Sequence, residues 1–160
     1  ERGRGDGLDR RHAENTGAEK AMTPLILIID DSPTMCKVLE SITRREGYRA
    51  ISFPDGFAAM QWLASPAGMV PALILLDLAM PRMDGISVLR YLKKKPALAG
   101  IPVIVLTGRE GTIDRLKARL AGASEYVVKP FTTRQIVALL QAYLGGGVPV
   151  QAEATHDSRD

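Results

Sequence analysis

The sequence contains a single cysteine, Cys36, among 160 residues. One cysteine cannot form an internal disulfide bond, and such sparse use of cysteine is typical of proteins from a reducing compartment. No apolar run approaches the roughly 20 residues that a membrane-spanning helix needs. Residues 1–23 are too polar for a secretory signal peptide. We therefore expect a cytoplasmic protein with no membrane partner.

Two further features point away from nucleotide cofactors and nucleic acids. No G-x-G-x-x-G pattern follows a predicted strand, which argues against a dinucleotide-binding domain. The net charge is only +3, and the basic runs Arg44-Arg45 and Lys93-Lys94-Lys95 are short and lie in segments with helical spacing. Such residues are more often solvated faces or last-turn charges that suit the helix dipole. We expect no direct binding of nucleic acid.

The composition fits one folded domain between two tails. Hydrophobic residues make up 46% of the chain and charged residues 24%, as in ordinary soluble domains. Residues 1–23 are polar and rich in glycine and charge, so we expect disorder there, with Met22 as a candidate natural start. Residues 146–160 follow a glycine run and are expected to form a flexible tail. The folded domain is predicted to span residues 24–145.

Strand and helix patterns alternate along this domain. Strands are predicted at Leu25–Ile29, Arg49–Phe53, Ala72–Leu76, Val103–Leu106 and Tyr126–Val128. Helical spacing follows each strand, with apolar positions at Met35, Val38, Leu39 and Ile42, then Phe57, Met60, Trp62 and Leu63 in the segment Asp55–Ala64, then Ile86, Leu89 and Leu92, then Ile113, Leu116 and Leu120, and last Ile136, Leu140 and Tyr143. Three of the strands are continuous apolar runs, which indicates a parallel α/β sheet covered on both faces.

Reactive side chains follow the strands where they end. Asp30-Asp31 follows the first strand, Asp77 the third, Thr107 the fourth and Lys129-Pro130 the fifth. Right-handed crossovers place these ends on one edge of the sheet, where open α/β sheets bind ligands. Carboxylates that converge repel one another unless a cation neutralises them. A ligand set made only of oxygen favours a hard divalent ion, and Mg²⁺ is the expected cofactor.

Each of these residues has an ordinary structural explanation when it is taken alone. Asp31 could form a turn or cap a helix, Thr107 could be a turn residue before Gly108, and Lys129 could be solvated. Together, three carboxylates, one hydroxyl and one ammonium at one sheet edge are the groups that phosphoryl transfer requires. The combination therefore favours a phosphoryl-transfer site.

The motifs IIDDS, LLDLAMPRMDG, VLTG and YVVKPF resemble the receiver domain of bacterial response regulators. The resemblance covers roughly residues 24–145. The DDSPTM start, the DGFAAM segment and the REGTIDRLKARLAGASEYVVKPF stretch are most similar to single-domain regulators of chemotaxis and twitching motility. The resemblance implies a flavodoxin-like, doubly wound (βα)5 fold with a parallel five-stranded sheet of order 2-1-3-4-5.

The resemblance also implies a role for the acidic residues. Asp77 would accept a phosphoryl group from a histidine of a sensor kinase or phosphotransfer protein, a form of covalent catalysis by a carboxylate. Asp31 would bind Mg²⁺ directly and Asp30 mainly through water. Asp77 and the backbone carbonyl of Ala79 would complete the protein ligands. The chain would be a phosphoacceptor that promotes its own phosphorylation and dephosphorylation, not a metabolic enzyme.

The remaining motif residues would respond to the phosphoryl group. Lys129 would pair with its oxygens, and Thr107 would donate a hydrogen bond to one of them. Tyr126 would be the aromatic switch that turns inward when Thr107 moves, and Pro130 would follow a cis peptide bond. Without the resemblance, Tyr126 would be taken as an amphipathic strand residue with its hydroxyl at the surface.

Two alternatives use the same fold class. A haloacid-dehalogenase-type phosphatase also has an aspartate nucleophile at a strand end, but it needs a second aspartate where Ala79 stands. A receiver that binds partners without phosphorylation would not require the five residues Asp30, Asp31, Asp77, Thr107 and Lys129. The lifetime of the phosphoryl group stays open, because small Ala79 would admit water whereas Arg109 could cover the site.

The expected output is contact with a protein partner. Beyond Leu144 only a glycine run and a polar tail remain, so we expect a target in trans, with phosphorylation-dependent pairing of two receivers as an alternative. The expected surface comprises the last helix, the strand at Tyr126–Val128 and the helix at Ile113–Leu120. The sequence names neither the kinase nor the pathway.

Overall fold

The computed structural model describes residues 23–145. The expected disorder before residue 23 and the expected flexible tail over 146–160 lie outside these residues. The strands are β1 (Leu25–Ile29), β2 (Arg49–Phe53), β3 (Leu73–Leu76), β4 (Val103–Thr107) and β5 (Glu125–Val128). The helices are α2 (Pro33–Arg45), α3 (Gly56–Ala64), α4 (Gly85–Lys94), α5 (Thr112–Leu120) and α6 (Thr133–Leu144). Predicted and observed strand limits differ by one residue at most.

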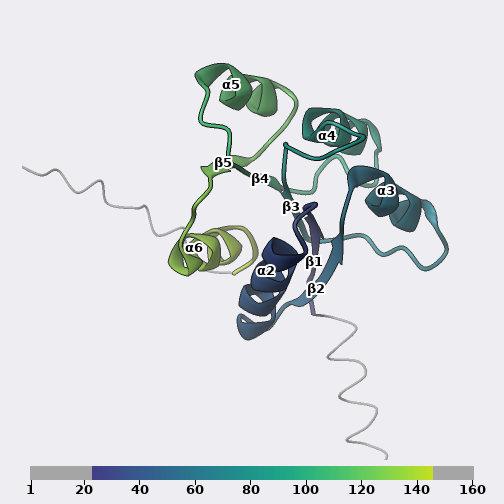
Figure 1. Cartoon of the computed structure of the whole chain (residues 1–160). Coiled ribbons are helices and arrows are strands. Elements are labelled where there is room, and N and C mark those ends of the chain that lie inside the picture. The colour runs from purple at the N-terminus through teal and green to yellow at the C-terminus, as the bar shows by residue number, and fades with distance from the viewer. Residues whose placement is uncertain (1–22, 146–160) are drawn as a thin grey trace, which may run out of the picture.

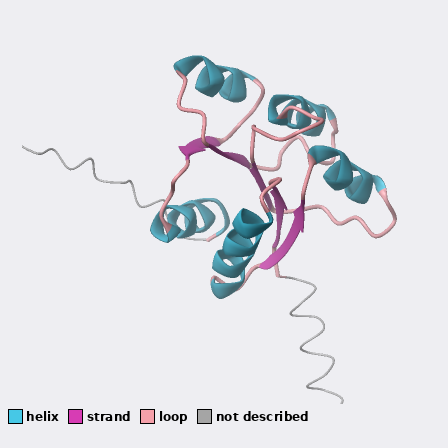
Figure 2. Ribbon diagram, viewed as in Figure 1, coloured by secondary structure: helices cyan, strands magenta, loops and turns pink. Residues whose placement is uncertain are grey.

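All five strands are parallel and lie in the order β2-β1-β3-β4-β5. Figure 1 shows α2 and α6 on one face of the sheet, and α3, α4 and α5 on the other. The strands cross the middle of the molecule and the helices surround them (Figure 2). The predicted doubly wound (βα)5 fold is therefore confirmed.

The side-chain period of two in β1 divides the core between the two faces. Ile26 and Ile28 pack with the buried residues of α2 and α6, whereas Leu27 and Ile29 pack with those of α3 and α4. All four are at most 1% exposed. Burial of one such side chain stabilises the fold by about 1.5–3 kcal/mol. A central strand with apolar residues on both faces is therefore fixed firmly in its register.

Helix starts are set by side chains that the sequence places just before them. The Ser32 hydroxyl accepts a hydrogen bond from the Met35 amide at 3.2 Å, and Pro33 occupies the first helical turn of α2. The Asp55 carboxylate accepts one from the Ala58 amide at 2.7 Å. Such caps satisfy amide groups that have no partner within the helix. They fix where α2 and α3 begin, directly after the strand ends.

Some predicted apolar faces are not the buried ones. Val38 is 42% exposed, and the buried positions of α2 include Cys36 and Thr43. Helix α5 differs most, because its only buried residue is Ala118. Its three large apolar residues are more than half exposed: Ile113, Leu116 and Leu120. The small side chain of Ala118 faces the core, so the larger residues point to solvent. None of the helices within residues 23–145 has the length and apolar character to cross a membrane.

Candidate functional site

Two aspartates lie side by side at the carboxyl ends of the central strands. The Asp30 amide donates to the Phe53 carbonyl at 3.2 Å, and the Asp77 amide donates to the Ile29 carbonyl at 2.9 Å. The ladder of the parallel sheet thus continues one residue past β1 and β3, and it fixes both backbones. Asp30 is 2% exposed and Asp77 6% exposed. Two carboxylates buried this close need compensating partners.

Asp30 has a partner for each carboxylate oxygen. Its Oδ1 accepts the Ser32 amide at 2.9 Å, and its Oδ2 accepts Lys129 Nζ at 2.8 Å. The thiol of Cys36 donates to the Asp30 carbonyl at 3.2 Å. Burial, followed by the Asp30 charge, raises the pKa of this thiol. Sequence reasoning treated Ser32 only as a helix cap and gave Cys36 no place at the site.

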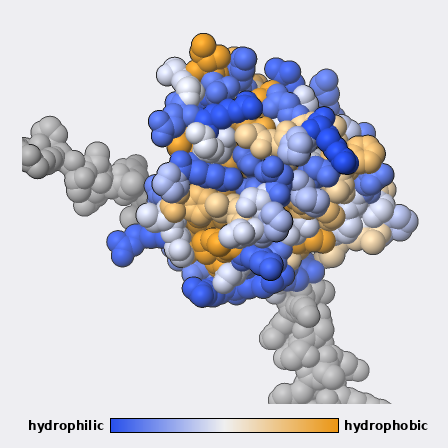
Figure 3. Space-filling model, in the orientation of Figure 1, coloured by the Kyte–Doolittle hydropathy of each residue, from blue (hydrophilic) through white to orange (hydrophobic). Residues whose placement is uncertain are grey.

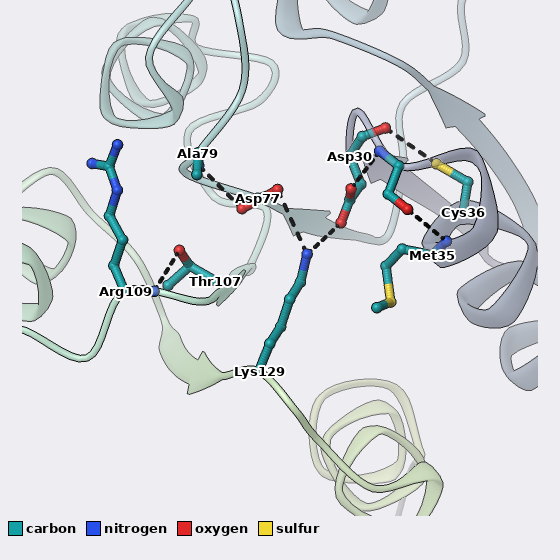
Figure 4. Close-up of polar contacts among 9 residues, drawn as sticks. Asp30, Met35, Cys36, Asp77, Ala79, Thr107, Arg109 and Lys129 are labelled. Carbon is teal, nitrogen blue, oxygen red and sulfur yellow. Dashed lines mark hydrogen bonds and ion pairs between the residues drawn. The ribbon is translucent and has the colours of Figure 1, made fainter.

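Asp77 faces the same lysine from the neighbouring strand (Figure 4). Its Oδ1 accepts the Ala79 amide at 3.1 Å, and its Oδ2 lies 3.6 Å from Lys129 Nζ. Burial raises the pKa of Asp77 above the usual aspartate value, although the Ala79 hydrogen bond and the Lys129 charge act in the opposite direction. The negative charge of the carboxylate is thus only partly neutralised, and a bound cation would neutralise the rest.

The three acidic residues can hold a metal ion. Carboxylate oxygens of Asp30, Asp31 and Asp77 lie within 4.8 Å of one another, and Asp31 is exposed at the mouth of the group. Three carboxylates and the single Lys129 ammonium leave a formal charge of −2. A divalent cation would balance that charge, and an all-oxygen donor set suits Mg²⁺ or a similar hard ion. The residues present therefore fit the expected metal.

The two predicted switch residues are joined through the backbone of Arg109. Thr107 is fully buried, and its hydroxyl accepts the Arg109 amide at 3.3 Å. The Tyr126 hydroxyl donates to the Arg109 carbonyl at 2.7 Å, and the Arg115 guanidinium lies 5.0 Å from the Tyr126 ring centre. Burial raises the pKa of Tyr126. Sequence reasoning considered only the Arg109 side chain, because backbone bridges leave no residue-type signal, and it did not identify Arg115.

Two backbone features shape the loops around the site. The Lys129–Pro130 peptide bond is cis, the isomer that the resemblance implied. Helix α4 begins against the end of β3, where a Cβ on Gly85 would lie 2.6 Å from the Asp77 carbonyl oxygen. Only glycine permits that approach. The neighbouring Asp84 occupies the N-cap position of α4 without a side-chain cap hydrogen bond. Arg82 in the same loop has φ 70°.

Comparison with known proteins agrees with this geometry. Residues 26–141 match the response regulator receiver domain. The chain is 33% identical over 127 residues to Protein PilG of Pseudomonas aeruginosa, covering 79% of this chain and 92% of that protein. It is 37% identical over 123 residues to the DNA-binding response regulator MtrA of Mycolicibacterium smegmatis, covering 77% of this chain. The chain spans about half of MtrA, 51% of its length.

Solved structures give the same result. The Mn²⁺-bound form of response regulator Rcp1 superposes with a TM-score of 0.70 at 26% identity, covering 79% of this chain and 98% of that one. The chemotaxis response regulator CheY4 of Vibrio cholerae shares the fold, with a TM-score of 0.70 at 22% identity over 77% of this chain and 100% of that one. The predicted resemblance is confirmed by the receiver domain match and by the similarity to PilG, and the chain belongs to the response regulator receiver domain family.

Proposed function

We propose that Asp77 accepts a phosphoryl group from a histidine of a sensor kinase or phosphotransfer protein, in a cytoplasmic two-component pathway. The observation that carries the proposal is the position of Asp77, buried at the end of β3 beside Lys129 and the acidic pair Asp30 and Asp31. A single ammonium serves two carboxylates here, since Lys129 Nζ is 2.8 Å from Asp30 and 3.6 Å from Asp77. This arrangement supports a nucleophile that is held in place and not fully neutralised.

The transfer forms one bond and breaks another. A lone pair of the Asp77 carboxylate attacks phosphorus and forms an acyl phosphate. The phosphorus–nitrogen bond to the donor histidine breaks, its electron pair returns to the imidazole, and that nitrogen takes up a proton. The Ala79 amide orients the carboxylate through its 3.1 Å hydrogen bond to Oδ1. Lys129 stabilises negative charge on the transferred oxygens, and attack by water later returns Asp77 and inorganic phosphate.

Mg²⁺ is the proposed cofactor, and when bound it supplies charge neutralisation and orients the phosphoryl oxygens. Asp31 would bind it directly, Asp30 mainly through water, and Asp77 with the Ala79 carbonyl would complete the set. The charge of −2 that remains at the site supports a divalent ion over a monovalent one. Asp31→Ala should therefore weaken Mg²⁺ binding more than Asp30→Ala, as measured by calorimetry.

Phosphorylation would act on the surface through Thr107 and Tyr126. An acyl phosphate at Asp77 carries up to about two negative charges where the ionised carboxylate carried one, and the Thr107 hydroxyl would turn to donate to it. The backbone of Arg109 contacts both Thr107 and Tyr126, so displacement of this segment would loosen the Tyr126 hydroxyl. Tyr126 lies on β5 between α5 and α6, which we propose as the surface for a partner in trans or for a second receiver.

Two rival functions have less support. A haloacid-dehalogenase-type phosphatase would need an acid at position 79, where an exposed alanine stands. A receiver that binds its partner constitutively would not need Asp30, Asp77 and Lys129 in contact. Comparing the acetyl phosphate labelling of the wild-type protein with that of Asp77→Asn distinguishes this second rival from the proposal.

The first test is labelling by acetyl phosphate with and without Mg²⁺, followed by intact mass. The wild type should gain one phosphoryl group only with Mg²⁺, and Asp77→Asn should gain none. Asp84→Asn is the matched control, because Asp84 is an exposed acid in the loop after β3 and its side chain makes no cap hydrogen bond. Labelling of Asp77→Asn at the wild-type level would show that the acceptor lies elsewhere.

The second test is amide hydrogen exchange with and without the phosphodonor. Exchange should change at Tyr126–Val128 and along α5 and α6 more than at Val38–Gly47 in and after α2. The physical reason is that the phosphoryl group must favour one of two preexisting states through Thr107 and Tyr126. A response confined to α2 would place the output surface elsewhere.

A further inference from the structure

A groove between α4 and the C-terminal end of α5 forms a second candidate interaction surface, away from β5 and α6. Its volume is about 260 Å³, and its walls are formed by Arg90, Lys93, Lys94, Leu120 and Ala121. It lies on the side of α5 that faces α4, whereas Tyr126 and Arg115 lie together on the side that faces β5. In Figure 3, hydrophobic residues at the top of the molecule, over α5, are bordered by hydrophilic ones.

The charge of this groove is uniformly positive. No aspartate or glutamate occurs between Asp84 and Glu110, so α4 contributes cations alone. Arg90 and Lys94 are exposed, and neither takes part in an ion pair within residues 23–145. Lys117 is also exposed and lies one turn before Leu120 on the same helix. Arg90 and Lys94 on the concave surface, with Lys117 nearby on α5, form an attractive field for an anionic ligand.

Lys93 has a different role, because its ammonium is already bound. Its Nζ donates to the Ala99 carbonyl at 3.1 Å and to the Ile101 carbonyl at 2.7 Å. Burial lowers the pKa of this lysine. The aliphatic stem packs against Gly122, where a Cβ would lie 2.8 Å from Lys93 Cγ. Lys93 therefore holds the wall of the groove, and the ligand would meet Arg90 and Lys94 instead.

The groove also contains an apolar anchor point. Leu120 is 79% exposed, the largest exposed fraction among the apolar side chains noted on α5, and Ala121 lies beside it. A phosphate backbone would make no use of a leucine, and a flat lipid surface would not fill a groove between two helices. A helical peptide with an apolar side chain flanked by acids would match both the apolar floor and the basic rim.

We propose that the α4–α5 groove binds an acidic, amphipathic segment of a protein partner, with a leucine-like side chain seated against Leu120 and carboxylates against Arg90 and Lys94. Within residues 23–145, no hydrogen bond or ion pair joins a groove residue to the side chain of Asp77, Thr107 or Tyr126, so binding needs no phosphoryl group. The groove would hold a partner before and after signalling, on the α4 side of α5, whereas the surface formed with β5 lies on the side of α5 that carries Arg115.

The test uses the full chain and a fluorescent helical peptide made of leucine, glutamate and alanine, with leucine on one face. Anisotropy without a phosphodonor should show saturable binding, unchanged in Asp77→Asn. Leu120→Ser should weaken it by about tenfold, since a leucine contact contributes at least about 1.5 kcal/mol. Arg90→Glu with Lys94→Glu should weaken it by a similar factor. Leu116→Ser is the matched control, because Leu116 is 55% exposed on α5 but does not line the groove.

Several results would overturn the proposal. The proposal of an acidic partner is wrong if the peptide does not bind, or if a peptide with glutamine in place of glutamate binds equally well. The assignment of the binding site to this groove is wrong if Leu116→Ser weakens binding as much as Leu120→Ser does. Tighter binding of phosphatidylcholine–phosphatidylglycerol vesicles or of a DNA duplex than of the peptide would identify a membrane or nucleic acid as the ligand instead. Because the assay contains no phosphodonor, a failure here would leave the acetyl phosphate labelling of Asp77 unaffected.

Discussion

Replacing Lys129 with methionine should destabilise the metal-free protein by about 3 kcal/mol. Lys129 Nζ lies 2.8 Å from Asp30 Oδ2 and 3.6 Å from Asp77 Oδ2, and the two carboxylates are 2% and 7% exposed. At an effective dielectric constant of 20, these contacts correspond to roughly 6 and 5 kcal/mol of Coulomb attraction. Desolvation offsets much of this attraction, and loss of one partner of a buried ion pair costs about 3–5 kcal/mol. The lysine is 20% exposed, which favours the lower end of that range.

Mg²⁺ should remove most of this difference. The metal and the lysine neutralise the same carboxylates, so Lys129→Met should bind Mg²⁺ more tightly than the wild type. If saturating Mg²⁺ reduces the loss from about 3 to about 1 kcal/mol, the variant must bind the ion roughly thirtyfold more tightly. Urea unfolding followed by Trp62 fluorescence measures the free energy of unfolding with and without Mg²⁺. The signal reports folding because the Trp62 and Phe53 ring centres lie 5.5 Å apart in the folded protein.

The control is Lys94→Met, at an exposed lysine that makes no ion pair within residues 23–145. Its free energy of unfolding should change by less than about 1 kcal/mol in EDTA and in Mg²⁺ alike. If Lys129→Met loses the same stability with and without Mg²⁺, the lysine and the metal do not act on the same carboxylates. That result would refute the electrostatic reasoning.

Three further substitutions test the site and its support. The pKa of Asp77 is raised in the folded protein, so the fold favours the protonated carboxyl over the ionised one. The free energy of unfolding is therefore highest below the unfolded pKa of about 3.9, and it falls as the pH rises through the folded pKa. Asp77→Asn should therefore stabilise the metal-free protein at pH 7 and not at pH 3, and an equal gain at both, measured by urea unfolding, would contradict this. Gly85→Ala should cost about 1–3 kcal/mol and slow acetyl phosphate labelling, because the new Cβ would meet the Asp77 carbonyl oxygen; Gly100→Ala, whose Cβ meets nothing within 4 Å, is its control. Thr43→Val should raise the free energy of unfolding by about 1 kcal/mol, since the buried Thr43 hydroxyl has no hydrogen-bond partner in the part of the chain described, whereas exposed Thr34→Val should not.

The strand ends were predictable because their signals are local and mutually consistent. A continuous apolar run such as Leu73–Leu76 indicates a strand covered on both faces, and parallel crossovers then bring successive carboxyl ends together. This reasoning places Asp30, Asp77 and Lys129 at one edge, and the structure has them in contact. Cap residues such as Ser32 also predict where the helices start, close after the strands end.

The helix faces were less predictable, because a period of 3.6 shows which residues share a face but not what packs against it. In α5 the apolar residues at helical spacing, Ile113, Leu116 and Leu120, are exposed, and Ala118 is the buried residue of the helix. Close packing through a small residue leaves the larger face free for partners. The link through Arg109 was also hidden, because its amide and carbonyl make the contacts and any residue type could supply them.

The charge of −2 that remains at the site connects its chemistry to its switching. Without a metal, the ionised Asp77 is costly, which keeps the folded protein receptive to a divalent cation. A phosphoryl group on Asp77 would bring back negative charge at a point where Lys129 is already shared with Asp30. A further donor is the Thr107 hydroxyl at the end of the neighbouring strand β4, which now accepts the Arg109 amide. Recruiting that hydroxyl would disturb the segment that holds Tyr126. The excess of negative charge that favours metal binding would therefore also transmit phosphorylation to the surface.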